Sequence, residues 1–231
     1  MKKLIITTIL TLSIIGCKHK DGDDSKGWIK IDTQDKYSYY ITETSPTATK
    51  LFLIFPGYGG HYALDVGNYL KKSLTKRGEN AIIVSPYVDY KNPGLNEFVI
   101  THIKDIIDTI DHDSLIFLGV SAGACYSLEL SNSISADKIL PIAAGAYKKI
   151  GGQPTDELPD PSCGDVWFLN GFDYSTYEKY GILWDGTVYV DPTKRCADRN
   201  GLKISLVPGY DHGKSVDLIN DIPDVIQWLM E

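Results

Sequence analysis

Short hydrophobic runs and helically spaced hydrophobic positions alternate along this chain. The continuous apolar runs have strand length, and such runs are typical of strands that are covered on both faces. They predict strands at residues 50–55, 81–84, 115–118, 139–143, 166–169 and 202–207. Two short opening strands are expected before them, at residues 28–32 and 37–42.

Between these runs, apolar residues recur at spacings of three and four, as in amphipathic helices. Helices are expected at residues 64–76, 95–110, 121–133 and 215–230, and Pro223 should bend or restart the last one. The stretch 148–164 carries three prolines and is expected to be loop. The alternation of strands and helices predicts one α/β domain with a mostly parallel sheet covered by helices.

The first residues have the pattern of a targeting segment. Residues 1–3 are positively charged overall, and residues 4–16 are uncharged and mostly apolar. This apolar stretch is shorter than the about 20 residues that a membrane-spanning helix needs. We therefore interpret residues 1–16 as a cleaved signal peptide, residues 17–27 as a flexible polar tether, and residues 28–231 as the folded domain.

The end of the signal peptide, Leu-Ser-Ile-Ile-Gly16-Cys17, resembles the lipobox of bacterial lipoproteins. The resemblance implies that Cys17 carries lipid and that the exported protein is anchored to a bacterial membrane, in the periplasm or at the cell surface. An ordinary secretory signal with an incidental cysteine is the alternative.

Composition narrows the functional classes. The chain has 23 Lys and Arg against 30 Asp and Glu, a net charge of −7, which argues against nucleic acid as a partner. Its hydrophobic share of 43% is enough to form a core. The four cysteines form no C-x-x-C pair, which argues against a thiolate zinc site, and no organic cofactor is implied.

The strongest chemical signal is a G-x-S-x-G motif at residues 119–123, with Ser121 at its centre. It directly follows the apolar run 115–118 and directly precedes a helical stretch. A strand–turn–helix of this kind exposes the serine hydroxyl above the sheet, and the glycines prevent collisions with the neighbouring strand and helix. Ser121 is therefore the candidate nucleophile; a glycine-rich turn without chemistry is the alternative.

A nucleophilic serine needs a base and an acid that orients the base. His212 lies in a Pro-Gly-Tyr-Asp-His-Gly loop between the last strand and the last helix, where a base can reach Ser121. Asp173 follows the strand 166–169 and gives the chain order Ser, Asp, His. Asp173 is therefore our candidate acid, and its rivals in the irregular stretch that follows are Asp185, Asp191 and Asp198.

With these residues the chain resembles the α/β-hydrolases of the serine esterase type, over roughly residues 50–230. The resemblance implies an α/β-hydrolase fold with helices on both faces of the sheet. It also implies an oxyanion hole formed by the backbone N–H groups of Tyr58 and Ala122. The family's loop often begins His-Gly where this chain has Pro56-Gly57. Only some twenty residues separate Ile142 from Val166, too few for a large lid.

Two groups of residues outside the triad also carry predictions. Tyrosines near the predicted strand ends are candidates for stacking on a sugar or phenolic group, or else ordinary half-buried tyrosines: Tyr62, Tyr147, Tyr174 and Tyr210. Cys163 and Cys196 lie in predicted loops of an exported protein, and we expect a disulfide between them; two reduced, unrelated cysteines are the alternative. Cys125, in the helix after Ser121, should be a buried free thiol.

Together these features predict an exported, lipid-anchored serine hydrolase. It would cleave carboxylic esters through an acyl-enzyme, with short-chain or carbohydrate-linked acyl esters as the favoured substrates. A peptidase or thioesterase on the same fold is one alternative. A non-catalytic surface binding lipoprotein is another, although an intact Ser, His and Asp set argues against it.

Overall fold

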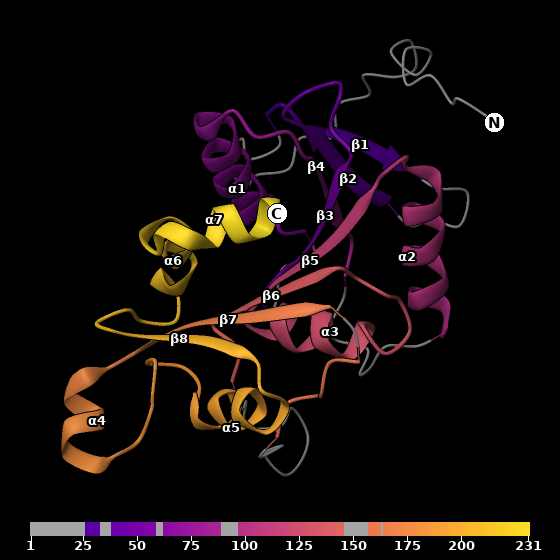
Figure 1. Ribbon diagram of the computed structural model, residues 1–231. Helices are drawn as coiled ribbons and strands as arrows, with labels where there is room; N and C mark the ends of the chain where they lie inside the picture. The colour runs from indigo at the N-terminus through magenta and orange to yellow at the C-terminus, as the bar shows by residue number, and fades with distance from the viewer. Residues whose placement is uncertain (1–25, 33–37, 59–61, 89–96, 146–156, 163) are drawn as a thin grey trace.

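The computed structural model describes residues 26–32, 38–58, 62–88, 97–145, 157–162 and 164–231. The predicted signal peptide, Cys17 and nearly all of the tether lie outside these residues. The central feature of the described residues is an eight-stranded sheet in the order β1-β2-β4-β3-β5-β6-β7-β8 (Figure 1). Its strands are β1 (Ile29–Asp32), β2 (Ser38–Glu43), β3 (Lys50–Phe55), β4 (Ile82–Pro86), β5 (Ser114–Val120), β6 (Lys138–Ile142), β7 (Asp165–Phe172) and β8 (Lys203–Pro208).

Strands β3 to β8 are parallel, whereas β1 and β2 join one edge in antiparallel fashion. The carboxyl ends of the parallel strands therefore lie along the same edge of the sheet. In this class of sheet, ligands bind outside the carboxyl ends of the strands. The loops that follow β3, β5, β6, β7 and β8 are consequently the place to look for a site.

Helices cover both faces of the sheet (Figure 1). One face packs against α1 (Leu64–Arg77), α6 (Leu218–Asp221) and α7 (Pro223–Met230), and the other against α2 (Glu97–Thr109), α3 (Ala122–Leu130) and α5 (Asp191–Asn200). Helix α4 (Tyr174–Tyr180) instead lies away from the sheet, and a short 3₁₀ helix, η2 (Lys214–Asp217), precedes α6.

The continuous apolar runs are explained by this sandwich. In β3, Leu51, Leu53 and Phe55 enter one core, whereas Phe52 and Ile54 enter the other. All five side chains are fully buried. A strand covered on both faces needs no alternation of polar and apolar residues. For this reason residues 51–55 are all hydrophobic.

The predicted strands and the predicted helices are confirmed to within a few residues, including the restart of the last helix at Pro223. Two helices, α4 and α5, were not predicted. Helix α4 spans only seven residues and buries none of them, so its sequence contains no core-facing stripe long enough to predict a helix. Helix α5 buries four small or medium residues, Pro192, Thr193, Cys196 and Ala197, which do not form a conspicuous apolar stripe.

Most of the predicted proline-rich loop lies outside the described residues; the described part, 157–162 and Gly164, contains no helix or strand. No helix in the described part of the chain is long and apolar enough to cross a membrane.

Candidate active site

The turn between β5 and α3 holds Ser121 in a strained backbone conformation. Its φ is 59° and its ψ is −116°, values that a residue with a side chain rarely adopts. Its N–H donates a 2.8 Å hydrogen bond to the carbonyl of Ile142 at the end of the neighbouring β6. Strain of this kind persists only where the surrounding structure fixes it, and it is concentrated at functional sites.

Two glycines make this turn sterically feasible. A Cβ on Gly119 would lie 2.1 Å from the carbonyl oxygen of Gly123, and one on Gly123 would lie 2.3 Å from the carbonyl oxygen of Phe55. Both obstacles are backbone atoms, which cannot move aside as a flexible side chain can. Residues 119–123, which we call the elbow, therefore have the G-x-S-x-G sequence for a steric reason.

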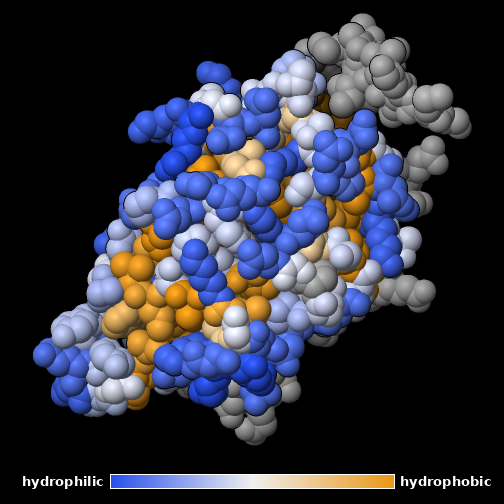
Figure 2. Space-filling view, in the orientation of Figure 1, coloured by the Kyte–Doolittle hydropathy of each residue, from blue (hydrophilic) through white to orange (hydrophobic). Residues whose placement is uncertain are grey.

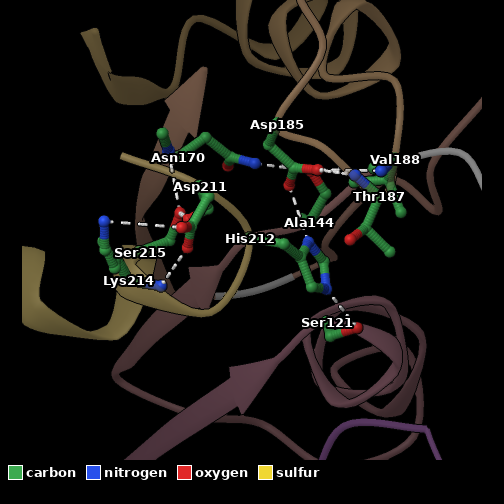
Figure 3. Close-up of polar contacts among 12 residues, drawn as sticks. Ser121, Ala144, Asn170, Asp185, Thr187, Val188, Asp211, His212, Lys214 and Ser215 are labelled. Atoms are coloured by element: carbon green, nitrogen blue, oxygen red, sulfur yellow. Dashed lines mark hydrogen bonds and ion pairs between the residues drawn. The ribbon is translucent and has the colours of Figure 1, made fainter. Parts of the chain in front are cut away.

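His212 lies between Ser121 and a buried carboxylate (Figure 3). Its Nε2 is 2.8 Å from Ser121 Oγ, and its Nδ1 is 2.6 Å from Asp185 Oδ2. An ionised carboxylate only accepts hydrogen bonds, so in the neutral ring Nδ1 carries the proton and Nε2 accepts from the serine hydroxyl. The three side chains thus form a continuous hydrogen-bonded path.

The acid of this path is fixed from several directions. The side chain of Asp185 is fully buried, and its other oxygen, Oδ1, accepts hydrogen bonds from the N–H groups of Thr187 (2.9 Å) and Val188 (2.8 Å). The backbone N–H of His212 donates to the Asp185 carbonyl at 2.8 Å. A buried carboxylate is tolerated when its oxygens are paired in this way, and the pairing leaves Oδ2 aimed at the histidine ring.

The loop that carries His212 is docked on the end of β7. A Cβ on Gly171 would lie 2.2 Å from the Tyr210 carbonyl oxygen, so only glycine allows the loop to approach this closely. The Gly171 N–H donates to Ser215 Oγ at 3.0 Å, and Ser215 Oγ in turn donates to the Asp211 carbonyl at 2.9 Å. These contacts hold the residues on both sides of His212.

A second cluster connects β6, β7 and α5 below the acid. The carbonyl of Ala144 accepts hydrogen bonds from Asn170 Nδ2 and from Thr193 Oγ1, both at 2.6 Å and both from fully buried side chains. Ala143, one residue earlier, has a left-handed φ of 51°. A Cβ on Gly145 would meet the Val188 side chain at 2.5 Å, so this loop packs directly on the turn that holds Asp185.

No protein-family model matches the chain, and no curated protein matches it in sequence. Solved structures do match its architecture. Est1E from Butyrivibrio proteoclasticus superposes with a TM-score of 0.59 at 14% identity, over 88% of this chain and 97% of that one. A further structure of Est1E has ferulic acid bound.

Two other matches carry the fold in their descriptions. MGS-M1, an alpha/beta hydrolase enzyme from a deep-sea metagenome library, has a TM-score of 0.59 at 15% identity and covers 87% of this chain and 96% of its own. XC6422 from Xanthomonas campestris, a serine hydrolase without a lid, has a TM-score of 0.56 at 14% identity, with coverages of 88% and 94%. This chain has the α/β-hydrolase fold.

The predicted serine and histidine, Ser121 and His212, meet in this fold, but the predicted aspartate does not lie beside them. Asp173 follows β7 directly, but its carboxylate caps α4, accepting hydrogen bonds from the Ser175 N–H and hydroxyl and from the Thr176 hydroxyl. These contacts, led by that from Thr176, lower the pKa of Asp173. The prediction for Asp173 is therefore wrong, and Asp185, one of its rivals, lies at His212 instead.

The remaining rivals are also placed away from the histidine. The carboxylate of Asp191 accepts from the Leu183 N–H at 3.2 Å, and that of Asp198 pairs with Lys194 on α5. The signal for Asp185 in the sequence is the Asp-Gly-Thr-Val turn, in which Gly186 has a φ of 95°. An aspartate whose own turn satisfies one oxygen is free to direct the other elsewhere.

The two predicted oxyanion donors lie at the ends of β3 and β5. Ala122 is the first residue of α3, where the N–H groups have no partner within the helix. Tyr58 lies just after Gly57, whose Cβ position is 3.4 Å from Ser121 Cβ, so this loop approaches the nucleophile closely. Residues 59–61, which continue the loop, lie outside the described residues.

The predicted tyrosine contacts divide into different environments. Tyr62 packs edge-on against Tyr40 and Tyr87, with ring centroids at 4.8 and 5.5 Å, and burial raises its pKa. The hydroxyl of Tyr210 donates to Asp221 on α6 at 2.7 Å and is thus engaged in the fold. Tyr174 is exposed on α4, and Tyr147 lies outside the described residues.

The predicted disulfide is not supported. Cys196 is a free thiol on the buried side of α5, not in a loop, and its Sγ is 3.7 Å from the Pro159 carbonyl. Cys163 lies outside the described residues. Cys125 is confirmed as a free thiol; it is partly buried in α3, and burial raises its pKa to about 11. Among the described residues, no cluster of His, Cys, Asp and Glu could hold a metal ion.

Proposed function

We propose that this protein is a serine hydrolase that cleaves carboxylic esters through Ser121, His212 and Asp185. The observation that carries the proposal is the hydrogen-bonded series from Ser121 Oγ through both ring nitrogens of His212 to Asp185 Oδ2. It coincides with a strained serine backbone on a strand–turn–helix elbow. A structural serine would need neither the strain nor the buried acid.

The geometry gives each residue a role in a two-step reaction. As Ser121 Oγ attacks the ester carbonyl carbon, His212 Nε2 takes the hydroxyl proton, and it then gives that proton to the departing alcohol oxygen. The C–O bond to the alcohol breaks and an acyl-serine remains. A water molecule attacks this acyl group while His212 again accepts a proton, and the collapse of the second intermediate returns the proton to Ser121.

Asp185 remains a carboxylate throughout this cycle. It holds the Nδ1–H tautomer and stabilises the positive charge that the ring acquires in each step. Negative charge on the former carbonyl oxygen would be held by the backbone N–H groups of Ala122 and Tyr58. Ala122 supplies the donor at the start of α3, where the helix dipole also favours an anion.

For substrates we propose esters of short acyl groups or of acyl groups carried on carbohydrate. The short connection between β6 and β7 leaves little chain for a cover over the site, and XC6422, a similar fold, is described as having no lid. The ferulic acid bound by Est1E gives a precedent for an aromatic acyl group on this fold.

A fluorophosphonate probe and a panel of p-nitrophenyl esters of rising acyl length test this function. We expect the protein to be labelled once, at Ser121, and to hydrolyse acetate and butyrate esters faster than long-chain ones. Thioesters and peptide amides in the same panel separate the other hydrolase classes. Absence of both labelling and hydrolysis in a folded sample would overturn the proposal.

We also propose that the protein is exported and anchored through lipid on Cys17, on the strength of the Gly16-Cys17 pattern after an apolar leader. Two or more acyl chains give stable membrane attachment. Cys17→Ala should release the protein into the soluble fraction, whereas the wild type should fractionate with membranes and show a lipid-modified N-terminal peptide by mass spectrometry. An unmodified Cys17 in the mature wild type would contradict this.

A further inference from the structure

Residues 173–190, which we call the acid segment, leave the sheet after β7 and return to α5, and Asp185 lies near their end (Figure 1). This segment holds most of the large exposed hydrophobic side chains in the described part of the chain. They are between 38% and 60% exposed: Tyr174, Tyr177, Tyr180, Ile182 and Tyr189. Such a concentration within one short segment calls for an explanation.

The folded core does not explain these rings. Helix α4 buries no residue, and its tyrosines recur at every third position, which places them on one side of the helix. The ring of Tyr177 packs edge-on against Phe172 at 5.6 Å, but Tyr174 and Tyr180 remain 54% and 60% exposed. A helix with no buried face gains little stability from exposed aromatic rings, so a ligand is the better explanation.

The exposed rings are connected directly to the catalytic acid. Trp184 and Tyr189 form an isolated antiparallel bridge that closes the turn around Asp185, and their rings lie 4.9 Å apart. The N–H of Asp173 donates to the Trp184 carbonyl at 2.7 Å, which ties the start of α4 to the same turn. The aromatic side chains therefore belong to the segment that positions Asp185.

The exposed surface of the acid segment is amphipathic rather than uniformly hydrophobic. Figure 2 shows strongly hydrophobic surface over β8 and α6, whereas the lobe formed by α4 is pale to blue. A tyrosine offers a flat apolar face and a hydroxyl at its end. A sugar ring has the matching features, because its C–H groups form flat apolar faces and its hydroxyls form a polar rim.

The charge of the segment selects among sugar polymers. Its exposed charges are two carboxylates, Asp173 and Glu178, against one ammonium group, Lys179, and the whole chain has a net charge of −7. Polyanions such as uronic-acid polymers, nucleic acids and anionic lipid surfaces are repelled by this balance. A neutral glycan meets no such repulsion.

We infer that the exposed tyrosines of the acid segment bind a neutral glycan chain, which is the alcohol part of the ester cleaved at Ser121. The inference rests on the proposed ester hydrolysis and names its substrate class: acyl esters of neutral polysaccharides. The rings bind the sugars beside the ester, and the triad removes the acyl group. Binding of the chain adds affinity that a small ester cannot use.

Acetylated glucomannan is the probe, and a Tyr174→Ala/Tyr180→Ala double variant is the test; Tyr177 is spared because it contacts Phe172. Affinity electrophoresis of Ser121→Ala protein measures binding without turnover. We expect retardation by acetylated glucomannan but not by alginate, and at least tenfold weaker binding when the two tyrosines are also replaced. Ile29→Ala, at the opposite edge of the sheet and equally exposed, is the matched control and should bind normally.

Kinetics separate this inference from the proposed function. The kinetic test keeps Ser121 and compares the Tyr174→Ala/Tyr180→Ala variant with wild type. The ratio of kcat/KM for acetylated glucomannan to kcat/KM for p-nitrophenyl acetate should be at least tenfold lower in the variant. Tyr174→Trp/Tyr180→Trp should restore it, and circular dichroism checks the fold. A wild type inactive on both esters refutes the ester hydrolase, whereas an unchanged ratio in the double variant refutes only the glycan surface.

Two other occupants would also overturn the inference. If the double alanine variant turned a dimer into a monomer in sedimentation, the tyrosines would bind a second copy of the chain. The second occupant is a membrane. If protein lacking residues 1–17 floated with zwitterionic liposomes and the double alanine substitution abolished this flotation, the tyrosines would bind membrane.

Discussion

The elbow and the acid segment each place one side chain of the proposed triad, but they do so by opposite means. The elbow joins the end of β5 to the start of α3 beside β3, and it requires its glycines because a Cβ on Gly119 or Gly123 would lie 2.1 or 2.3 Å from a backbone oxygen. The acid segment leaves the sheet, and its helix α4 buries no side chain. Asp185 is held there by hydrogen bonds from the N–H groups of its own turn and by the hydrogen bond from the His212 N–H to its carbonyl.

This difference determines how each region should respond to change. At the elbow, steric requirements dictate the sequence, so small substitutions should damage the fold itself. In the acid segment, only the turn at Asp185 and its contacts with the Ala144 cluster are constrained, so substitutions elsewhere on its surface should leave the fold intact. The following predictions compare the two regions.

The largest effect should come from the reacting pair. We expect Ser121→Ala to reduce kcat/KM for p-nitrophenyl acetate by roughly 10⁴-fold or more, and His212→Ala by a similar factor, because the residues act as one unit. For the same reason the double variant should lose little more than either single variant. Additive losses would show that the two side chains act separately, and a variant with a tenth of wild-type activity would contradict the mechanism.

At the elbow, Gly123→Ala should lower the free energy of unfolding by about 3 kcal/mol or more, because its Cβ would meet the Phe55 carbonyl oxygen. The measurement is chemical denaturation followed by circular dichroism. Gly213→Ala is the control: its φ of −69° suits alanine, and the nearest atom to its Cβ is 3.7 Å away. Its stability should change by no more than about 0.5 kcal/mol. Equal stabilities for the two variants would refute the steric account of the elbow.

The same contrast explains what the sequence could and could not predict. Ser121 was identifiable because its motif is a local steric requirement, and His212 because a strand end and a closing helix bracket it. Asp173 is the candidate that the sequence favours because it follows β7 directly, but α4 intervenes, and this seven-residue helix buries no residue that would reveal it. Which aspartate returns to the histidine depends on the path of the chain between β7 and α5, a long-range property that the Asp-Gly-Thr-Val turn at Asp185 does not determine by itself.

In the acid segment, the support from the Ala144 cluster should give a smaller effect. Thr193→Val keeps the side-chain volume but removes the 2.6 Å hydrogen bond to the Ala144 carbonyl. We expect about 1 kcal/mol of lost stability. The β6 loop packs on the turn around Asp185, so kcat should also fall by roughly three- to tenfold with little change in KM. Thr176→Val, on exposed α4, is the control, and a Thr193 variant equal to it in kcat would show that the cluster does not position the acid.

The free thiols on the helices that follow the two regions, Cys125 on α3 and Cys196 on α5, should behave alike and show the smallest effect. Burial raises the pKa of Cys125 to about 11 and also raises that of Cys196. Because the thiolate is the reactive form, both should react with iodoacetamide much more slowly at pH 8 in the native protein than after denaturation. Alkylation after denaturation without reductant should label Cys196 completely. If Cys196 were labelled only after reduction, the predicted disulfide with Cys163 would be supported instead.

The most direct test of the account compares the two aspartates of the acid segment under identical conditions. Asp185→Asn keeps the shape of the side chain but removes the charge that holds the Nδ1–H tautomer of His212. We expect kcat/KM for p-nitrophenyl acetate to fall by roughly 10³- to 10⁴-fold. Asp173→Asn alters only the cap of exposed α4 and should stay within about twofold of wild type. If Asp173→Asn were inactive and Asp185→Asn retained its activity, Asp173 would be the acid and the central claim would be contradicted.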